Sequence, residues 1–255
     1  MKQDRKITNY QDESRPLFAG IDIGSAHAVC VVGTIDHEKK IINVLGGGTT
    51  DSSGIEAGAI TNIAEAASSI KSALEKAERI AGGHAEAAVV AIRGSFIEAR
   101  GAVGTAATDI STKTVTQEVK DNAVNNAQET VTGELPANSD VFQVVVRGLL
   151  LDKNKGSVGM KGLSLEADVY ALSAPLFNME NINSSLETAE IKSIKMIYSY
   201  LASSDILIRQ EEYEGCLIVD FGGSTIGLVI YVDKTLRFTY EFPTGSEMIT
   251  KGISR

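Results

Sequence analysis

Residues Gly215–Tyr231 read GCLIVDFGGSTIGLVIY, and this stretch decides the predicted fold. An apolar run ends at Asp220, two glycines follow, and a second apolar run begins at Ile226. This order predicts a β-hairpin with a glycine turn at its tip. Glycines let a ligand approach the backbone closely, and consecutive backbone N–H groups form a concavity that binds anions. A carboxylate at a strand end, such as Asp220, suits a hydrated Mg²⁺ ion.

The same pattern occurs a second time near the N-terminus. The sequence FAGIDIGS at 18–25 is followed by an apolar run at 28–32, so Asp22 is the counterpart of Asp220. Taken alone, each hairpin has a plain structural explanation, because a strand-end Asp also caps its own turn. The long-range duplication instead predicts two similar α/β lobes that present two phosphate-binding hairpins to one cleft.

The bulk composition predicts a globular, cytoplasmic protein. The 255 residues are 43% hydrophobic and 22% charged, as is usual for folded domains. The net charge of −9 argues against a nucleic-acid surface, which needs clustered Lys and Arg. No apolar run reaches the length of a membrane span, and residues 1–16 lack the apolar core of a signal peptide. Cys30 and Cys216 lie in apolar strand runs, which predicts buried thiols.

Residues 17–82 predict the first part of one lobe, after a flexible tail at 1–16. An apolar stripe at 60–77, with spacings of three and four residues, predicts a helix that ends at Gly82. Its many alanines allow close packing on a sheet. The glycine-rich stretch at 46–54 has the composition of a loop.

From about residue 83 the pattern changes to one that predicts a small inserted α+β module over 83–170. Besides a helix from Thr116 to Val131, we expect strands at 87–92, 96–103, 141–151 and 164–172. Residues 171–210 are expected to return to the first lobe and to end in a connecting helix. Residues 211–255 are expected to begin the second lobe.

These motifs together resemble those of the actin-like ATPase superfamily, and within it the FtsA family of bacterial cell-division proteins. The two hairpins look like its phosphate-1 and phosphate-2 loops, and VGMKGLSLE at 158–166 is similar to a segment specific to FtsA. The likeness covers nearly all of 17–255 and implies an α/β, actin-like (ribonuclease-H-like) fold. It also implies that the first lobe is subdomain 1A, that the inserted module is the SHS2-type subdomain 1C, and that the second lobe, 2A, is incomplete.

The resemblance implies an ATP and Mg²⁺ site in the cleft. Asp22 and Asp220 would organise Mg²⁺ through water. The nucleotide would be held by backbone N–H groups and hydroxyls of Gly24, Ser25, Gly222, Gly223, Ser224 and Thr225, with Gly245 touching it from the next loop. Strong ATPases of this superfamily carry a Glu or Gln near the start of the connecting helix, where it orients the attacking water. Residues 198–204 contain neither, so we expect binding with at most weak hydrolysis.

Two positions of the second hairpin depart from the family pattern. Ser224 stands where relatives usually have a third glycine, and its hydroxyl can still donate to phosphate. Gly227 stands where they usually have Asp, which leaves the role of that acid, beside the metal or in the fold, without a residue. The chain also ends at Arg255, inside an expected helix at 246–253, so we expect a fragment of a longer protein.

The family likeness implies an adaptor that self-associates, links FtsZ filaments to the cytoplasmic face of the membrane at the division site, and recruits later division proteins through the inserted subdomain. The FtsZ-binding part and the amphipathic membrane-anchoring helix of the family are expected outside residues 1–255. One alternative is a type IV pilus assembly adaptor, and another is an interaction module with a vestigial nucleotide site. A sugar or acetate kinase would need a catalytic base beyond Asp22.

Overall fold

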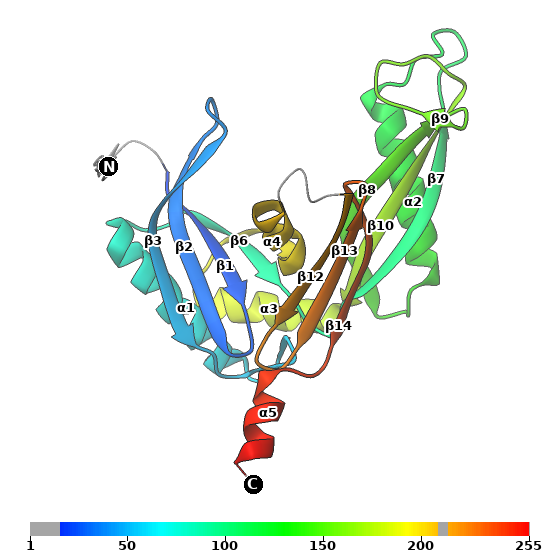
Figure 1. Cartoon of the computed structure of the whole chain (residues 1–255). Coiled ribbons are helices and arrows are strands. Elements are labelled where there is room, and N and C mark those ends of the chain that lie inside the picture. Colours follow the sequence, from blue (N-terminus) through cyan, green and yellow to red (C-terminus); the bar gives the residue numbers. More distant parts are fainter. Residues whose placement is uncertain (1–15, 209–213, 255) are drawn as a thin grey trace, which may run out of the picture.

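The computed structural model describes residues 16–208 and 214–254, and Figure 1 shows how they are arranged. Their strands form sheets of five, four, three and two strands. The predicted tail at 1–16 lies outside the described residues except for its last residue, and so does most of the predicted junction between the connecting helix and the second lobe. Among the helices of the described ranges, none is both long and apolar enough to span a membrane.

The first lobe is built on a five-stranded sheet in the order β11–β6–β1–β2–β3. In chain order its strands are β1 (Phe18–Ile23), β2 (His27–Asp36), β3 (Ile41–Asp51), β6 (Ala87–Ile92) and β11 (Ser193–Tyr198). Strand β1 pairs antiparallel with β2 and parallel with β6. Ala19, Ile21 and Ile23 are buried, because alternate side chains of a strand point to the same face. Strand β1 is thus central both to the sheet and to the core.

Two helices pack on this sheet and share its core, α1 (Ile63–Ala81) and α3 (Leu176–Thr188). The predicted start of the first helix is wrong, because Ile60 lies in the short hairpin of β4 (Ile55–Glu56) and β5 (Ala59–Ile60). The helix begins after Asn62, whose side chain accepts a hydrogen bond from a backbone N–H of the first turn. Gly82 ends it in the left-handed region at φ 80°, as predicted.

Strand β3 runs through the first three glycines of the stretch at 46–54 that was predicted to form a loop, and only residues 52–54 lie outside the strand. Residues 46–48 pair with β2 in the sheet. A Cβ added to Gly46 or to Gly48 would lie 2.1 Å from a backbone carbonyl oxygen of α1. The helix therefore lies directly against the backbone of β3, and the glycines serve this close approach rather than a turn.

We predict that Gly48→Ala lowers the free energy of unfolding by about 1–3 kcal/mol, the usual effect of overpacking a core. Gly47→Ala is the matched control, because its Cβ would meet its nearest neighbour, the Cys30 carbonyl oxygen, only at 3.9 Å. Denaturant unfolding of both variants, followed by circular dichroism, measures the difference. Equal stability of the two variants would contradict the close packing of α1 on β3.

The inserted α+β module projects away from the first lobe, in green in Figure 1. Its sheet has the order β7–β10–β8–β9, from β7 (Glu98–Ala107), β8 (Ser139–Leu151), β9 (Asn154–Lys155) and β10 (Ser164–Pro175). Thr116 caps α2 (Gln117–Glu134), as predicted, and this helix packs on the sheet. The prediction that 87–92 is a strand of this module is wrong. That strand, β6, pairs with β1 and β11, because its apolar side chains fill the core of the first lobe.

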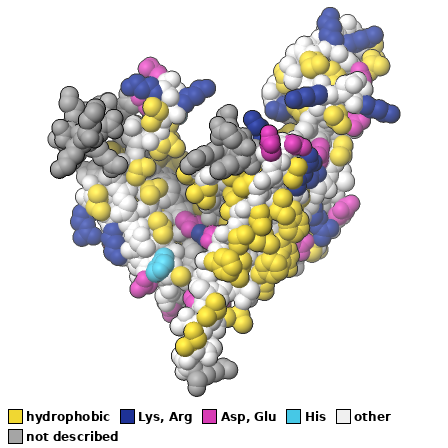
Figure 2. Space-filling view, viewed as in Figure 1, with side chains coloured by type: hydrophobic (Ala, Val, Ile, Leu, Met, Phe, Trp, Pro, Cys, Tyr) yellow, Lys and Arg dark blue, Asp and Glu magenta, His cyan; other side chains and the backbone are white. Residues whose placement is uncertain are grey.

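The described part of the second lobe is a three-stranded antiparallel sheet. Its strands are β12 (Gly215–Phe221), β13 (Ile226–Val232) and β14 (Thr235–Phe242), with α4 (Ser199–Leu207) before them and α5 (Ser246–Ile253) after them. One face packs through Val229 on a cluster that includes Tyr198 and Tyr200. The other face carries the apolar patch seen in Figure 2, which includes Leu217, Val219, Phe221, Phe238, Tyr240 and Phe242.

Both cysteines were predicted to be buried, and this is confirmed for one of them. Cys30, in the middle of β2, is fully buried, and its burial raises the pKa of the thiol to about 12. Cys216 is only half-buried, and it lies in β12, an edge strand of its sheet, whereas β2 is an inner strand.

Candidate functional site

The two predicted hairpins have the same turn geometry. In the first, the Gly24 N–H donates to the carbonyl oxygen of His27 at 3.2 Å, and in the second, the Gly222 N–H donates to that of Thr225 at 2.9 Å. A Cβ added to Gly24 or Gly222 would lie 2.8 Å or 2.9 Å from this same carbonyl oxygen. The turn geometry therefore excludes a side chain at both positions, which explains why each motif has a glycine there.

The tips of the two hairpins meet at one cleft. A Cβ added to Gly223 would lie 3.0 Å from the Cβ of Ala26. A cavity of about 370 Å³ lies between the hairpins and is lined by both tips and by Arg93. The backbone N–H groups of Ser25 and Gly223, which line this cavity, and of the neighbouring Ser224 have no acceptor among the residues that the structure describes. Unpaired N–H groups around a concavity suit an anion such as phosphate.

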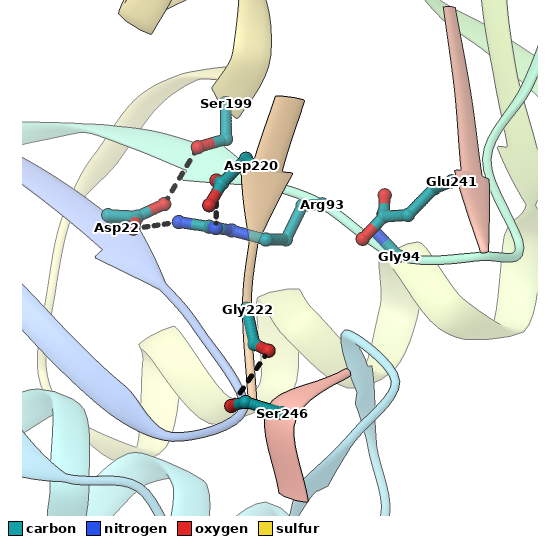
Figure 3. Close-up of polar contacts among 8 residues, drawn as sticks. All are labelled: Asp22, Arg93, Gly94, Ser199, Asp220, Gly222, Glu241 and Ser246. Atoms are coloured by element: carbon teal, nitrogen blue, oxygen red, sulfur yellow. Dashed lines mark hydrogen bonds and ion pairs between the residues drawn. The ribbon is translucent and has the colours of Figure 1, made fainter. Parts of the chain in front are cut away.

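Arg93 lies between the two predicted metal-binding carboxylates, Asp22 and Asp220 (Figure 3). Its Nη1 donates to Asp220 Oδ2 at 2.8 Å, and its Nη2 donates to Asp22 Oδ2. The hydroxyl of Ser199, at the start of α4, donates to the other oxygen of Asp22 at 2.9 Å. The structure thus brings the two carboxylates together, with a guanidinium between them.

Arg93 is held in a mostly buried position. Its side chain is 15% exposed, and its guanidinium carbon lies 5.7 Å from the centre of the Tyr200 ring. Burial lowers the pKa of Arg93, but the charges of Asp22 and Asp220 outweigh burial, so that its pKa is raised and the residue stays charged. Sequence reasoning missed Arg93 because a single arginine after a strand forms no motif. Its place at the end of a strand parallel to β1 is the signal that would have identified it.

The two serines that were predicted to hold phosphate also hold the turn between β4 and β5. Ser25 Oγ accepts a hydrogen bond from the Gly58 N–H at 3.1 Å, and Ser224 Oγ accepts one from the Ala57 N–H at 3.0 Å. A hydroxyl that accepts a bond keeps its own proton for donation. Ser25, which lines the cavity, can therefore fix this turn and donate to an anion in the cavity at the same time.

Of the two remaining predicted residues, Thr225 lines the cavity and Gly245 does not. Thr225 is buried, with its hydroxyl near Glu241. Gly245 packs on the second hairpin, because an added Cβ would lie 2.3 Å from the Gly223 carbonyl oxygen. The N–H groups of Ser246 and Glu247 donate to the carbonyl oxygens of Gly222 and Gly223. In the described arrangement Gly245 thus supports the hairpin from the start of α5.

Gly227, where the family pattern leads us to expect Asp, makes room for Tyr200. A Cβ at this position would lie 2.1 Å from the Cζ atom of the Tyr200 ring. Tyr200 is itself almost fully buried, in an edge-to-face contact with Tyr198 at a centroid distance of 5.1 Å. The missing acid at 227 is therefore matched by a large aromatic ring on α4, a pairing that the sequence alone did not reveal.

Gly227→Ala should lower the free energy of unfolding by about 1–3 kcal/mol, because its Cβ overlaps the Tyr200 ring. The same change in a Tyr200→Ala background should cost much less, since the ring is gone. A double-mutant cycle from denaturant unfolding measures this coupling. Gly215→Ala is the control, with open space around its added Cβ. Additive effects of Gly227→Ala and Tyr200→Ala would contradict the proposed contact.

Glu241 of β14 is a buried carboxylate behind the cleft (Figure 3). It accepts a hydrogen bond from the Gly94 N–H at 2.7 Å. Burial raises the pKa of Glu241 and outweighs the nearby hydroxyls of Thr225 and Tyr200 and the Gly94 N–H, which lower it. Glu241 thus joins β14 to the segment that carries Arg93, although nothing in the sequence pattern marked it.

The raised pKa of Glu241 predicts a loss of stability with rising pH. Above its ordinary value of 4.5 the unfolded chain releases a proton that the folded chain retains, so the free energy of unfolding falls until the folded-state pKa is passed. Glu241→Gln keeps an acceptor for Gly94 and should flatten this fall. Thermal unfolding over a pH series, with the exposed Glu187→Gln as control, tests it. A wild-type profile unchanged by Glu241→Gln would refute the prediction.

Sequence comparison identifies relatives over nearly the whole chain. No family model matches it. It is 27% identical over 248 residues to the cell division protein FtsA of Neisseria meningitidis. This match covers 96% of this chain and 58% of the relative. It is 27% identical to FtsA of Pseudomonas aeruginosa, over 95% of this chain and 58% of that protein. It is 26% identical to FtsA of Escherichia coli K12, over 94% of this chain and 57% of that protein. The chain thus spans less than two thirds of these relatives.

Solved structures show the same fold at lower identity. The PilM-PilN type IV pilus biogenesis complex matches with a TM-score of 0.67 and 14% identity, over 93% of this chain and 64% of that one. The ethanolamine utilization protein EutJ of Carboxydothermus hydrogenoformans matches with a TM-score of 0.51 and 16% identity, over 94% of this chain and 56% of that one. The chain is therefore similar to FtsA over nearly its whole length, and its fold is that of the actin-like ATPases.

Proposed function

We propose that this chain is an actin-like cell-division protein of the FtsA type. The observation that supports the proposal is an identity of 26–27% to FtsA proteins of several bacteria over 94–96% of the chain. A match of this extent includes both hairpins, the inserted module and the connecting helix. The chain spans 57–58% of those relatives. The functions of the whole relatives are therefore only proposals for this chain.

Within this proposal the protein self-associates and works with FtsZ filaments on the cytoplasmic face of the membrane at the division site. The inserted module, predicted at 83–170, would contact later division proteins. Exposed apolar residues at its far end support such a contact, since Ile110 is 90% and Leu163 is 62% exposed. Exposed apolar side chains on a projecting module are typical of protein-binding surfaces.

We infer that the cleft holds the phosphate end of ATP. The two matching glycine turns, the cavity of about 370 Å³ and the unpaired N–H groups of Ser25, Gly223 and Ser224 support this ligand. Helix α4 begins with Ser199, Tyr200 and Leu201, without the carboxylate or amide that orients an attacking water. We therefore propose nucleotide binding with at most weak hydrolysis.

The residues present do not fit a Mg²⁺ ion between Asp22 and Asp220. Mg²⁺ prefers carboxylate oxygens and water in a nearly octahedral arrangement. Here Arg93 bonds one oxygen of each carboxylate, and Ser199 bonds the second oxygen of Asp22. We therefore assign no metal to this pair of carboxylates as they are arranged.

A second candidate function is a pilus assembly adaptor. The likeness to the PilM-PilN complex, with a TM-score of 0.67, favours it on fold alone.

The two functions predict different phenotypes when the gene is depleted in the bacterium that encodes it. A division protein should leave long, undivided cells, and a fluorescent fusion should form a band at the division site. Re-expression of the gene is the control and should restore division. Normal division with loss of surface pili would reject the FtsA-type function in favour of the pilus adaptor.

A further inference from the structure

Arg93 joins the two lobes through their paired carboxylates. One Nη group bonds Asp22 of β1, and the other bonds Asp220 of β12. A planar guanidinium presents its donors in a fixed fork, so one arginine can hold two carboxylates at once. We propose that Arg93 supplies the positive charge that a divalent metal would bring to such a cleft, so that the lobes are joined and a phosphate chain is bound without metal. The ligand part of this proposal rests on the nucleotide site proposed above.

The hydrogen bonds at the cleft leave little room for a competing metal. The two carboxylates have four oxygens, of which Arg93 bonds two and Ser199 bonds one. Of these four oxygens, only Oδ1 of Asp220 has no hydrogen-bond partner among the described residues. A metal ion between Asp22 and Asp220 would therefore have to displace the guanidinium, whose charge would still remain nearby.

Arg93 is also fixed by the groups around its backbone and its side chain. The N–H of the next residue, Gly94, donates to the buried Glu241 of the second lobe. The turn between β4 and β5 packs directly against the backbone carbonyl group of Arg93, since a Cβ added to Gly58 would lie 2.2 Å from the Arg93 carbonyl oxygen. The Tyr200 ring lies against the guanidinium. These contacts hold the arginine in the cleft, so it acts as a built-in part of the site.

Arg93 reduces the negative charge of the cleft. It lowers the net charge of the two carboxylates from −2 to −1, which weakens their repulsion of an anionic ligand without a metal ion. The phosphate chain itself is bound by the N–H groups of Ser25, Gly223 and Ser224 rather than through a metal that bridges it to the carboxylates. The ligand class is a polyphosphate chain, such as that of ATP or inorganic tripolyphosphate, without a chelated metal.

Calorimetric titration with ATP, in excess MgCl₂ and in EDTA, tests the metal dependence. We expect the same dissociation constant under both conditions for the wild type. Arg93→Gln should bind ATP about tenfold more weakly in EDTA, because the cleft loses the positive charge that offsets one of its two carboxylates. Inorganic tripolyphosphate as a second probe shows whether the phosphate chain suffices without the nucleoside. Wild-type binding that requires Mg²⁺ would overturn the proposal.

The chain offers a matched control for this substitution. Arg147 has the same chemistry as Arg93, with a side chain that is 16% exposed, an ion pair to Asp168 and the Tyr170 ring 5.2 Å from its guanidinium carbon. It lies within the inserted module, so Arg147→Gln should leave ATP binding unchanged. Arg93→Lys keeps the charge but not the fork, and should fall between the wild type and Arg93→Gln. If Arg93→Gln fails to fold, Arg93→Lys replaces it in the titration, and we expect it to bind ATP more weakly than the wild type in EDTA.

The joining of the lobes is tested separately, without any nucleotide. Hydrogen exchange followed by mass spectrometry should show faster exchange in β12, β13 and the tip of the first hairpin in Arg93→Gln, but not in Arg147→Gln or in wild type with EDTA. Exchange in Arg93→Gln equal to that in Arg147→Gln would refute the link between the lobes. Absence of ATP binding in wild type under both conditions would instead reject the nucleotide site, and the exchange result would still decide the role of Arg93.

Discussion

The parallel pairing of β6 with β1 is the constraint on which the candidate site depends. In this register Ala91 pairs with Asp22, and two residues later the chain places Arg93 at the same edge of the sheet. The guanidinium thus lies beside Asp22, and β12 brings Asp220 to its other side. If β6 belonged to the sheet of the inserted module, Asp22 and Asp220 would face each other as two like charges. One strand pairing therefore places a positive charge between the two carboxylates of the cleft.

Polar and apolar contacts work together along the boundary between the lobes. The hydroxyls of Tyr198 and Thr239 are 3.0 Å apart, and Tyr170 reaches the Thr239 N–H. Around them, Val229 and Leu236 pack on the tyrosines in one buried cluster. Buried hydroxyls that pair with one another avoid the free-energy cost of an unsatisfied polar group. The three-stranded sheet is therefore held by a hydrogen-bonded aromatic core as well as by the charges at the hairpin tips.

Much of the fold and part of the site could be predicted from local pattern. Alternating and continuous apolar runs located both hairpins, and cap signals at Thr116 and Gly82 set helix ends correctly. The glycines at 46–48 were misread, because composition cannot distinguish a glycine needed for a turn, such as Gly54 at φ 72°, from one needed for the close approach of a helix. The sheet to which 87–92 belongs was also misassigned, since a short apolar strand fits the core of either sheet equally well.

The sequence by itself determined the paired hairpins, their strand-end carboxylates and the likeness to FtsA, because these depend on residue order within short segments. Only the tertiary structure decided what lies between the carboxylates. Arg93 comes from a third segment, far from both Asp22 and Asp220 in sequence, and no local pattern relates the three. The same holds for Gly227 and Tyr200, whose fit depends on Tyr200 of α4 packing on β13. Contacts of this kind are decided by strand register and packing between segments, which local sequence patterns do not encode.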